Sequence, residues 1–169
     1  MATISYLTTV QFGFGELKTV ADGLAQLGIS RPLIVTDRGL AATDLIDRLR
    51  AASPVLGNAA LFSETPTNPT EEAVLAALAV YREHGCDGLV AIGGGSPIDL
   101  AKGVALLAGH DGPLETYAAI LGGIPKITAK VAPVIAIPTT AGTGSEVGRA
   151  ALITLNDGRK LGFISPHLI

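Results

Sequence analysis

The sequence predicts an α/β fold, in which a mostly parallel β-sheet is flanked by helices and followed by a C-terminal β-hairpin. Short runs that are apolar throughout alternate along the chain with longer segments whose apolar residues recur at helical spacing. A strand that is apolar on both faces is covered on both sides, as in parallel βαβ units. The chain has 169 residues, enough for one domain with a buried core. We therefore expect residues 1–169 to form a single Rossmann-like domain, whose ligands bind beyond the carboxyl ends of the strands.

Strands and helices alternate in the first part of the chain. The run 9–14 predicts a first strand, and 16–27 has the apolar spacing of a helix. The run 32–36 has the length and apolar character of a buried strand, and 40–52 again has helical spacing. A weaker strand is expected at 59–62.

The same alternation continues to the end of the chain. Thr70 is a favourable N-cap for a helix that ends near residue 84, because two glutamates then lie in its first turn, where the helix dipole favours anions. The next expected elements are strand 88–92, helix 97–108, a loose segment at 113–130 with a short helix around Tyr117, and strand 133–137. The chain closes with an expected hairpin, in which an Asn-Asp-Gly turn joins 151–155 to 160–164.

The composition excludes several classes of protein. Hydrophobic residues make up 48% of the chain and charged residues 16%, which is typical of a globular protein and not of a disordered one. No apolar run reaches the roughly 18 residues of a membrane helix, and the N-terminus has no signal-peptide pattern. The single cysteine, Cys86, fits a reducing cytoplasm. With a net charge of −3 and no basic cluster, we expect a cytoplasmic protein that binds neither nucleic acid nor membrane.

The segment GGGSPID at 93–99 joins an expected strand to an expected helix. Ser96 as N-cap, Pro97 as first residue and Asp99 as third predict a capping box at this helix start. A helix N-terminus presents unpaired N–H groups and a partial positive charge, and residues without a Cβ let a phosphate approach closely. The alternative is a tight strand-to-helix turn, which needs fewer than three glycines. The segment predicts a phosphate site, although it is not the GxGxxG pattern.

Two further candidates follow expected strands. The loop PTTAGTGSE at 138–146 carries hydroxyls suited to ribose, phosphate or amide groups, although an ordinary capped turn has the same composition. Asp37 ends the strand 32–36. A carboxylate there accepts hydrogen bonds from the adenosine ribose and repels a 2′-phosphate, whereas the alternative role is to cap the next helix. Because parallel strands end at one edge of a sheet, we expect both candidates to lie beside GGGSPID.

The remaining candidates are weaker, and none predicts catalysis. Lys160 is placed to reach a ribose or phosphate or to be solvated in the hairpin, and Asn68 either contacts the nicotinamide side or shapes a turn. The three histidines have no metal-ligand spacing. The sequence contains no pattern typical of a Ser-His-Asp set, a carboxylate pair or a Cys/His cluster. We therefore assign no catalytic and no metal-binding residue.

Four motifs taken together resemble the N-terminal part of the iron-containing alcohol dehydrogenase family, over essentially the whole chain. They are VTDRGL at 35–40, TPTNPT at 65–70, GGGSPIDLAK at 93–102 and IPTTAGTGSEV at 137–147. The resemblance implies reversible hydride transfer between an alcohol, or the corresponding aldehyde, and NAD(P), with a divalent metal, iron or zinc, polarising the substrate oxygen. The cofactor-binding residues it implies are Asp37, Asn68, Gly94, Gly95, Ser96, Asp99, Thr139, Thr140, Thr143 and Lys160.

The resemblance assigns separate parts of NAD to these residues. It implies that Asp37 contacts the adenosine ribose, that Gly95 and Ser96 hold the pyrophosphate, and that Lys160 binds the nicotinamide ribose. The three threonines at 139, 140 and 143 would line the dinucleotide groove, with Asn68 close to the cofactor.

One departure from the family changes the expectation for activity. Family members are much longer, and their metal is held by Asp and His side chains in a helical C-terminal half, to which no histidine here corresponds. We therefore expect an NAD-binding domain truncated before the metal-binding domain and inactive alone. The alternatives are a free-standing nucleotide-binding regulatory module and a glycerol dehydrogenase-like or maleylacetate reductase-like enzyme. Exposed apolar surface and an open strand edge favour a homo-oligomer, at least a dimer.

Overall fold

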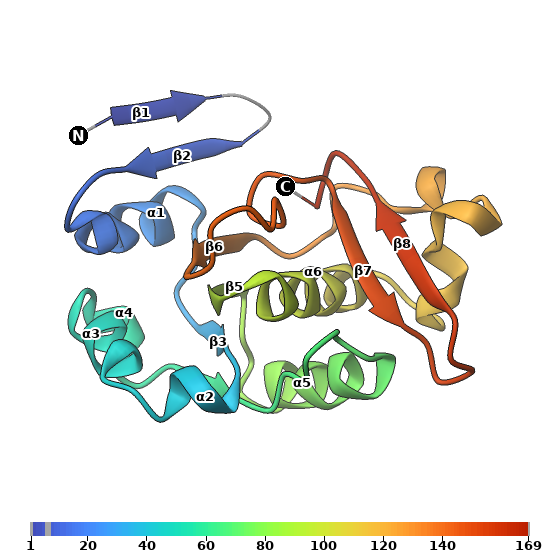
Figure 1. Ribbon diagram of the computed structural model, residues 1–169, viewed down its shortest axis with the longest axis horizontal. Coiled ribbons are helices and arrows are strands. Elements are labelled where there is room, and N and C mark those ends of the chain that lie inside the picture. The colour runs from blue at the N-terminus through green and yellow to red at the C-terminus, as the bar shows by residue number, and fades with distance from the viewer. Residues whose placement is uncertain (1, 6–7, 169) are drawn as a thin grey trace.

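Four parallel strands form the central sheet of the computed structural model, which describes residues 2–5 and 8–168 (Figure 1). They are β3 (Pro32–Val35), β4 (Ala60–Phe62), β5 (Gly88–Gly93) and β6 (Val134–Pro138), in the order β4-β3-β5-β6. Every residue of β3 and β5 is buried, because helices cover both faces of these central strands. The predicted α/β fold with a parallel sheet is confirmed.

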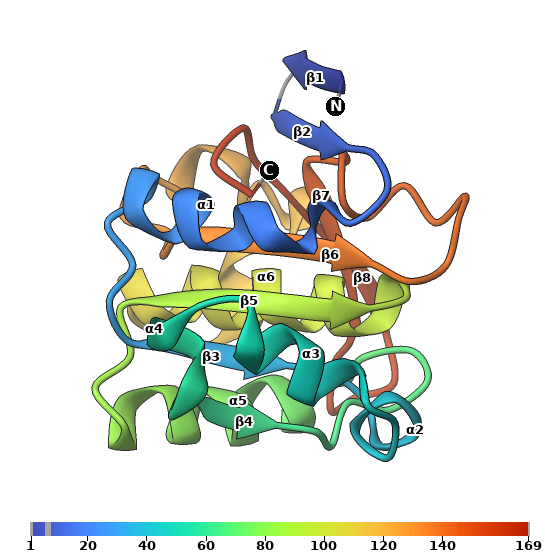
Figure 2. The same cartoon turned by 90° about the vertical axis from the view of Figure 1, so that its left-hand side faces the viewer.

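Helices form a layer on each face of the sheet (Figure 2). They are α1 (Val20–Gln26), α2 (Arg38–Ala41), α3 (Leu45–Ala51), α4 (Pro54–Gly57), α5 (Glu71–Glu83) and α6 (Gly95–Gly109). Side chains of α1, α3 and α4 pack on Ile34 of β3, whereas those of α5 and α6 pack on Leu33 and Val35. Alternate residues of one strand therefore enter two separate cores. Among the described residues, no helix is long and apolar enough to cross a membrane.

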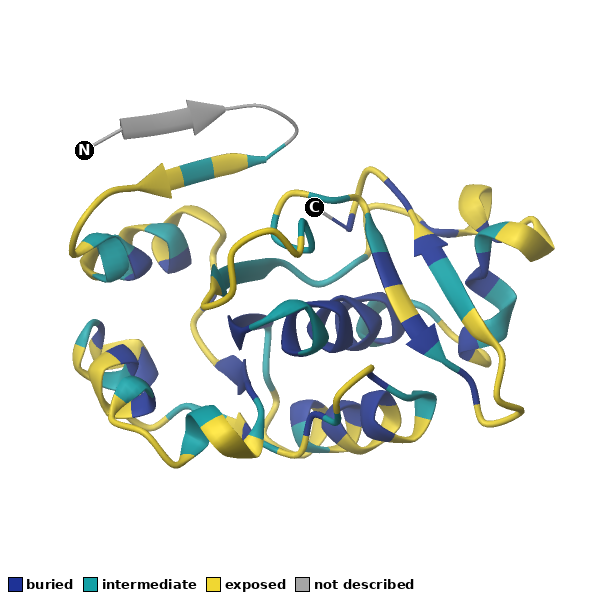
Figure 3. Ribbon diagram, in the orientation of Figure 1, coloured by how far each residue is buried: buried dark blue, intermediate teal, exposed yellow. Residues whose placement is uncertain are grey.

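A C-terminal hairpin covers the outer side of α6. Its strands are β7 (Ala150–Thr154) and β8 (Lys160–Ile164), and Gly158 in the turn has a φ of 87°, which confirms the predicted hairpin. Since α6 lies between the sheet and this hairpin, residues 97–107 are all buried (Figure 3). The Thr154 N–H donates to the Pro69 carbonyl at 2.9 Å, which ties the hairpin to the loop after β4.

Several predicted elements differ from those observed. The helix predicted at 40–52 is divided into α2 and α3, because Thr43 Oγ1 accepts a hydrogen bond from the N–H of Leu45 and starts a new turn. A further short helix, α4, follows Ser53, whose side chain caps it. The segment predicted as one helix at 16–27 begins as the 3₁₀ helix η1 (Glu16–Thr19) before α1.

The segment 113–130 and the N-terminal strands also differ from the elements predicted there. The loose segment 113–130 contains three 3₁₀ helices, η2 (Leu114–Tyr117), η3 (Ala119–Leu121) and η4 (Ile124–Lys126). The first predicted strand is shorter than expected, β2 (Thr9–Phe12), and pairs with an unpredicted strand, β1 (Ala2–Ser5). These two strands form an antiparallel sheet of their own, which stands apart from the parallel sheet (Figure 1).

Asp87 connects the turn before β3 to the start of β5. Its carboxylate accepts hydrogen bonds from the N–H of Ser30 at 3.0 Å, from the N–H of Arg31 at 2.8 Å and from the Ser30 hydroxyl. Burial opposes ionisation, but these hydrogen bonds hold the pKa of Asp87 below its ordinary value of 3.8. The ionised side chain therefore stabilises the folded state.

We expect Asp87→Asn to lower the free energy of unfolding at pH 7 by roughly 1 to 3 kcal/mol, because charge-assisted hydrogen bonds are weakened. The folded pKa is the lower one, so this stabilisation is complete above the unfolded pKa and disappears as the pH falls through the folded pKa. Urea unfolding from pH 7 to pH 2 should therefore show parent and variant converging in acid. Asp111→Asn, at an exposed position, is the control and should run parallel to the parent.

Candidate functional site

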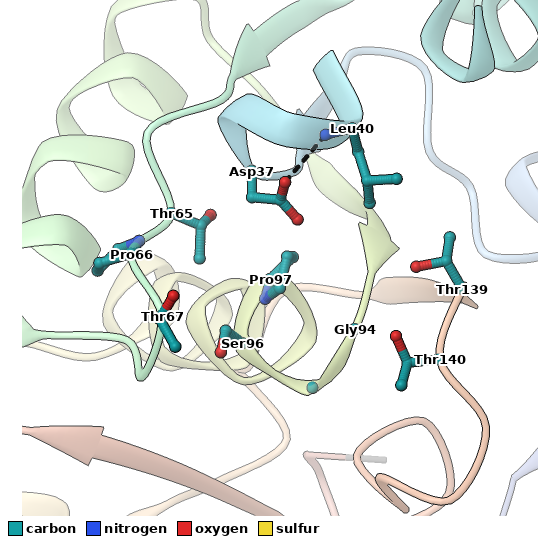
Figure 4. Close-up of a pocket in the computed structure, with 11 residues that line it drawn as sticks. Asp37, Leu40, Thr65, Pro66, Thr67, Gly94, Ser96, Pro97, Thr139 and Thr140 are labelled. Carbon is teal, nitrogen blue, oxygen red and sulfur yellow. Dashed lines mark hydrogen bonds between the residues drawn. The ribbon is translucent and has the colours of Figure 1, made fainter. Parts of the chain in front are cut away.

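A pocket of about 310 Å³ lies at the carboxyl ends of the parallel strands (Figure 4). Four segments meet there: the β3–α2 junction, the loop after β4, the start of α6 and the loop after β6. The residues that line it are Asp37, Leu40, Thr65, Pro66, Thr67, Gly94, Gly95, Ser96, Pro97, Thr139 and Thr140. This is the edge at which the sequence placed its candidates.

The helix α6 starts earlier than predicted, and the predicted capping box is wrong. Gly94 is the N-cap and Gly95 the first residue, so no side chain caps this helix end. The Ser96 hydroxyl instead accepts a hydrogen bond from the Asn68 N–H at 3.2 Å. A carboxylate oxygen of Asp99 accepts from the N–H of Leu152 at 3.0 Å. The first N–H groups of α6 therefore have no side-chain cap, which is the arrangement that suits an anion.

Glycine at position 93 has a different structural role from glycine at positions 94 and 95. Gly93 has a φ of 154°, and a Cβ there would lie 2.6 Å from Cγ of Pro97, so the turn itself requires a glycine. A Cβ on Gly94 would lie 3.3 Å from Oγ1 of Thr140, and one on Gly95 would lie 3.1 Å from Oγ of Ser145. Gly94 and Gly95 thus keep open the space between α6 and the loop after β6. A side chain at either position would narrow this space.

Asp37 performs the structural role and also borders the pocket. It is the N-cap of α2, and its Oδ1 accepts a hydrogen bond from the Leu40 N–H at 2.9 Å. The second carboxylate oxygen is turned toward the pocket (Figure 4). The capping role predicted as an alternative for Asp37 is confirmed, and its contact with the adenosine ribose stays a prediction.

The threonines of the loop after β6 divide into two groups. Thr139 and Thr140 line the pocket, and the N–H of Thr139 donates to the Gly93 carbonyl at 2.9 Å. Thr143 is not among the lining residues. Its hydroxyl donates to the carboxylate of Glu146 at 3.2 Å.

Asn68 and Lys160 lie next to the pocket without lining it. Asn68 has a φ of 60°, so it shapes the turn, as one alternative held. Its Oδ1 accepts a hydrogen bond from Nζ of Lys160 at 2.9 Å, and its N–H binds Ser96. Lys160 on β8 is therefore joined through Asn68 to the start of α6.

Asp99 is buried behind the pocket. Burial raises its pKa, while the N–H of Leu152, the hydroxyl of Ser145 and the ammonium groups of Lys102 and Lys160 oppose that rise. Its side chain faces the hairpin, which places Asp99 outside the pocket lining.

Five of the lining residues were not named as cofactor-binding residues, although they lie within the four motifs, namely Leu40, Thr65, Pro66, Thr67 and Pro97. The loop after β4 contributes more than Asn68, because it too follows a parallel strand at its carboxyl end, and the rule used for the other loops applies to Thr65 and Thr67 as well. Thr65 is buried, and its hydroxyl has no hydrogen-bond partner among the described residues.

A family model for iron-containing alcohol dehydrogenases matches residues 8–169. The chain belongs to the iron-containing alcohol dehydrogenase family. A 4-hydroxybutyrate dehydrogenase of Cupriavidus necator is 56% identical over 169 residues, which are 100% of this chain and 44% of the relative. A 1,3-propanediol dehydrogenase of Klebsiella pneumoniae is 38% identical, over 90% of this chain and 39% of the relative.

Solved structures of iron-containing alcohol dehydrogenase relatives have the same fold. A 1,3-propanediol oxidoreductase matches with a TM-score of 0.86 and 35% identity over 94% of this chain and 41% of its own. A sulfoacetaldehyde reductase of Bifidobacterium kashiwanohense, solved in complex with NAD⁺, matches with a TM-score of 0.85 and 30% identity over 94% and 42%. The chain thus spans less than half the length of these relatives.

The described residues do not provide a set of ligands for the iron ion after which the family is named. Within residues 2–5 and 8–168, no group of three or more His, Cys, Asp or Glu side chains is placed to hold a metal ion.

Proposed function

We propose that residues 1–169 act as the NAD-binding domain of an alcohol dehydrogenase, in which hydride passes reversibly between an alcohol and NAD. One observation carries the proposal: the uncapped start of α6, with Gly94 and Gly95, faces the carboxylate of Asp37 across one pocket. A dinucleotide has both a pyrophosphate, which suits an uncapped helix end, and ribose hydroxyls, which suit a carboxylate acceptor on the other side of the pocket. The relative at 56% identity makes 4-hydroxybutyrate the first alcohol to test.

Each side of the pocket takes a separate part of NAD in this proposal. The N–H groups of Gly95 and Ser96 bind the pyrophosphate, and Asp37 accepts hydrogen bonds from the adenosine ribose. Thr139 and Thr140 offer hydroxyls on the opposite wall. We place the nicotinamide ribose toward Lys160, whose ammonium group already reaches the loop after β4. When bound, NAD supplies the hydride acceptor, and the chain holds and orients it.

We further propose that these 169 residues bind NAD and do not oxidise alcohol by themselves. A developing alkoxide needs electrostatic stabilisation, which is usually the largest catalytic contribution, and none of the described residues that line the pocket is a cation. Calorimetric titration of the purified chain should show saturable binding of NAD and of ADP-ribose. No heat at millimolar nucleotide would contradict the nucleotide site. NADH formation from 4-hydroxybutyrate that depends on added iron or zinc would contradict the proposed inactivity.

Asp37 should set the preference between NAD and NADP. Asp37→Asn keeps the oxygen that caps α2 and removes the charge that repels a 2′-phosphate. We expect the ratio of NADP to NAD affinity to rise about tenfold, or about 1.4 kcal/mol. Asp47→Asn, in the exposed face of α3, is the control. An unchanged affinity ratio in Asp37→Asn would show that this carboxylate does not face the adenosine ribose.

We also propose that the chain is cytoplasmic and self-associates. Cys86 is a free thiol, as is usual in a reducing compartment. In the described residues β1 and β2 pair only with each other, and a two-stranded sheet alone is marginally stable. Phe12 at the end of β2 and Phe14 just after it are exposed, so a second copy would cover them. Light scattering should give a dimer or larger species, and a monomer at all concentrations would contradict this.

A further inference from the structure

Lys102 is a buried cation in the middle of α6. The residue is 4% exposed, and its ammonium group donates to the carbonyl oxygens of Ser145 at 2.7 Å and Gly148 at 2.5 Å. A third carbonyl oxygen, that of Ala150, lies at 3.4 Å. An ammonium group has three donors and no acceptor, and burying it is costly unless it is hydrogen-bonded. Here the protein supplies three backbone acceptors, all from the segment that runs from the loop after β6 into β7.

This loop has few other attachments. At its start the N–H of Thr139 donates to the Gly93 carbonyl, within it the N–H groups of Val147 and Gly148 donate to the carbonyl of Gly144, and at its end the Arg149 carbonyl accepts from the N–H of Ser165. Gly142 and Gly144 have positive φ values, so the loop bends at residues without side chains. Lys102 therefore fastens the far end of a loop whose near end forms one wall of the pocket.

Asp99 fastens the neighbouring segment in the same way. It precedes Lys102 by three residues, so both side chains lie on one face of α6. Its carboxylate holds the N–H of Leu152 in β7, and its negative charge, with that of Glu146, favours the ammonium form of Lys102. Burial acts against that form and lowers the pKa of Lys102.

We propose that Lys102 is a positioning residue for the nucleotide site: by binding the carbonyls of Ser145 and Gly148, it holds the loop 139–149 against α6 and so places Thr139 and Thr140 at the pocket. The inference rests on the proposed nucleotide binding. Lys102 does not line the pocket, and it was not among the cofactor-binding residues predicted from the sequence. Lys102 contacts neither reacting group nor cofactor in this assignment.

The test compares Lys102→Met with Lys126→Met, an exposed lysine outside the pocket. In Lys102→Met the loop loses the hydrogen bonds from its Ser145 and Gly148 carbonyls to α6, so we expect NAD to bind roughly tenfold more weakly while the circular dichroism spectrum keeps its helical content. Hydrogen exchange should accelerate within 139–149 and stay unchanged in α5. Lys126→Met should match the parent in all three measurements. NAD affinity equal to the parent in Lys102→Met would overturn the proposal, whether or not the loop exchanges faster.

A double variant separates positioning from a general loss of stability. If Lys102 acts through the pocket wall, adding Lys102→Met to Thr140→Val should weaken NAD binding much less than it does in the parent. Equal losses in both backgrounds would overturn the route through Thr140. Lys102→Gln is neutral but still donates hydrogen bonds, and it replaces Lys102→Met if that variant does not fold. We expect the same loss of NAD affinity and the same faster loop exchange in Lys102→Gln, each smaller in size. Failure of both to fold would overturn the assignment, because the other contacts of α6 should keep the fold.

The outcome also distinguishes this inference from the proposed function. A parent chain that binds neither NAD nor ADP-ribose overturns the nucleotide site and, with it, the positioning role. A parent that binds, with a Lys102→Met variant that binds equally well, overturns the role of Lys102 alone.

Discussion

Gly94→Val should abolish NAD binding while leaving the fold intact. Gly94 has a φ of −75° and a ψ of −163°, a conformation that any residue adopts, so the backbone does not require glycine. Its Cβ would lie 3.3 Å from Oγ1 of Thr140, and the two branches of valine would fill the space between that hydroxyl and the N–H groups of α6. A phosphate could then no longer approach. We expect affinity for NAD and for ADP-ribose to fall at least about 100-fold, or about 2.8 kcal/mol.

The matched control for this experiment is Gly57→Val. A Cβ at Gly57 meets no atom within 4 Å, and Gly57 in α4 does not line the pocket. Calorimetric titration should therefore return parental affinity for this control. Thermal unfolding of Gly94→Val should stay within a few degrees of the parent, which shows that binding and not folding was lost. A Gly94→Val protein that still binds ADP-ribose like the parent would mean that the phosphates lie elsewhere.

The parallel sheet could be predicted because every residue of its central strands is apolar and buried. β3 and β5 are apolar throughout, and this is possible only where both faces are covered. The division of the predicted helix 40–52 was harder to see, since it depends on one hydroxyl, that of Thr43, accepting from the N–H of Leu45. The pairing of β2 with β1 was missed because the first residues of the chain carry no clear alternation.

The site was predictable in its position and less so in its contacts. Strand ends brought Asp37 and the two loops to one edge, as the topology requires. The capping box failed because the actual partners of Ser96 and Asp99 are 28 and 53 residues away in the sequence. Lys102 was passed over for the same reason, as its acceptors are backbone carbonyls 43 to 48 residues later. A local pattern identifies a helix start, but tertiary contacts decide which of its side chains face a ligand.

Phe163→Ala should cause a large loss of stability by loosening the hairpin that covers α6. Phe163 in β8 is fully buried and packs in the same core as α5 and α6. Truncating such a side chain removes buried apolar area and leaves a cavity, which costs about 3 to 5 kcal/mol. For a chain of this size the melting temperature should fall by roughly 6 to 20 °C.

The control lies one residue further along the same strand. Ile164 is 40% exposed on the opposite face of β8, so Ile164→Ala should shift the melting temperature far less. Because β8 also carries Lys160, the Phe163→Ala chain at low temperature should bind NAD somewhat more weakly than the parent. Equal melting temperatures for the two variants would mean that the hairpin does not pack on α6 in solution. Asp99 and Lys102 would then lack the partners that make their burial favourable, because the N–H and carbonyl groups that they bind belong to the hairpin and to the loop before it.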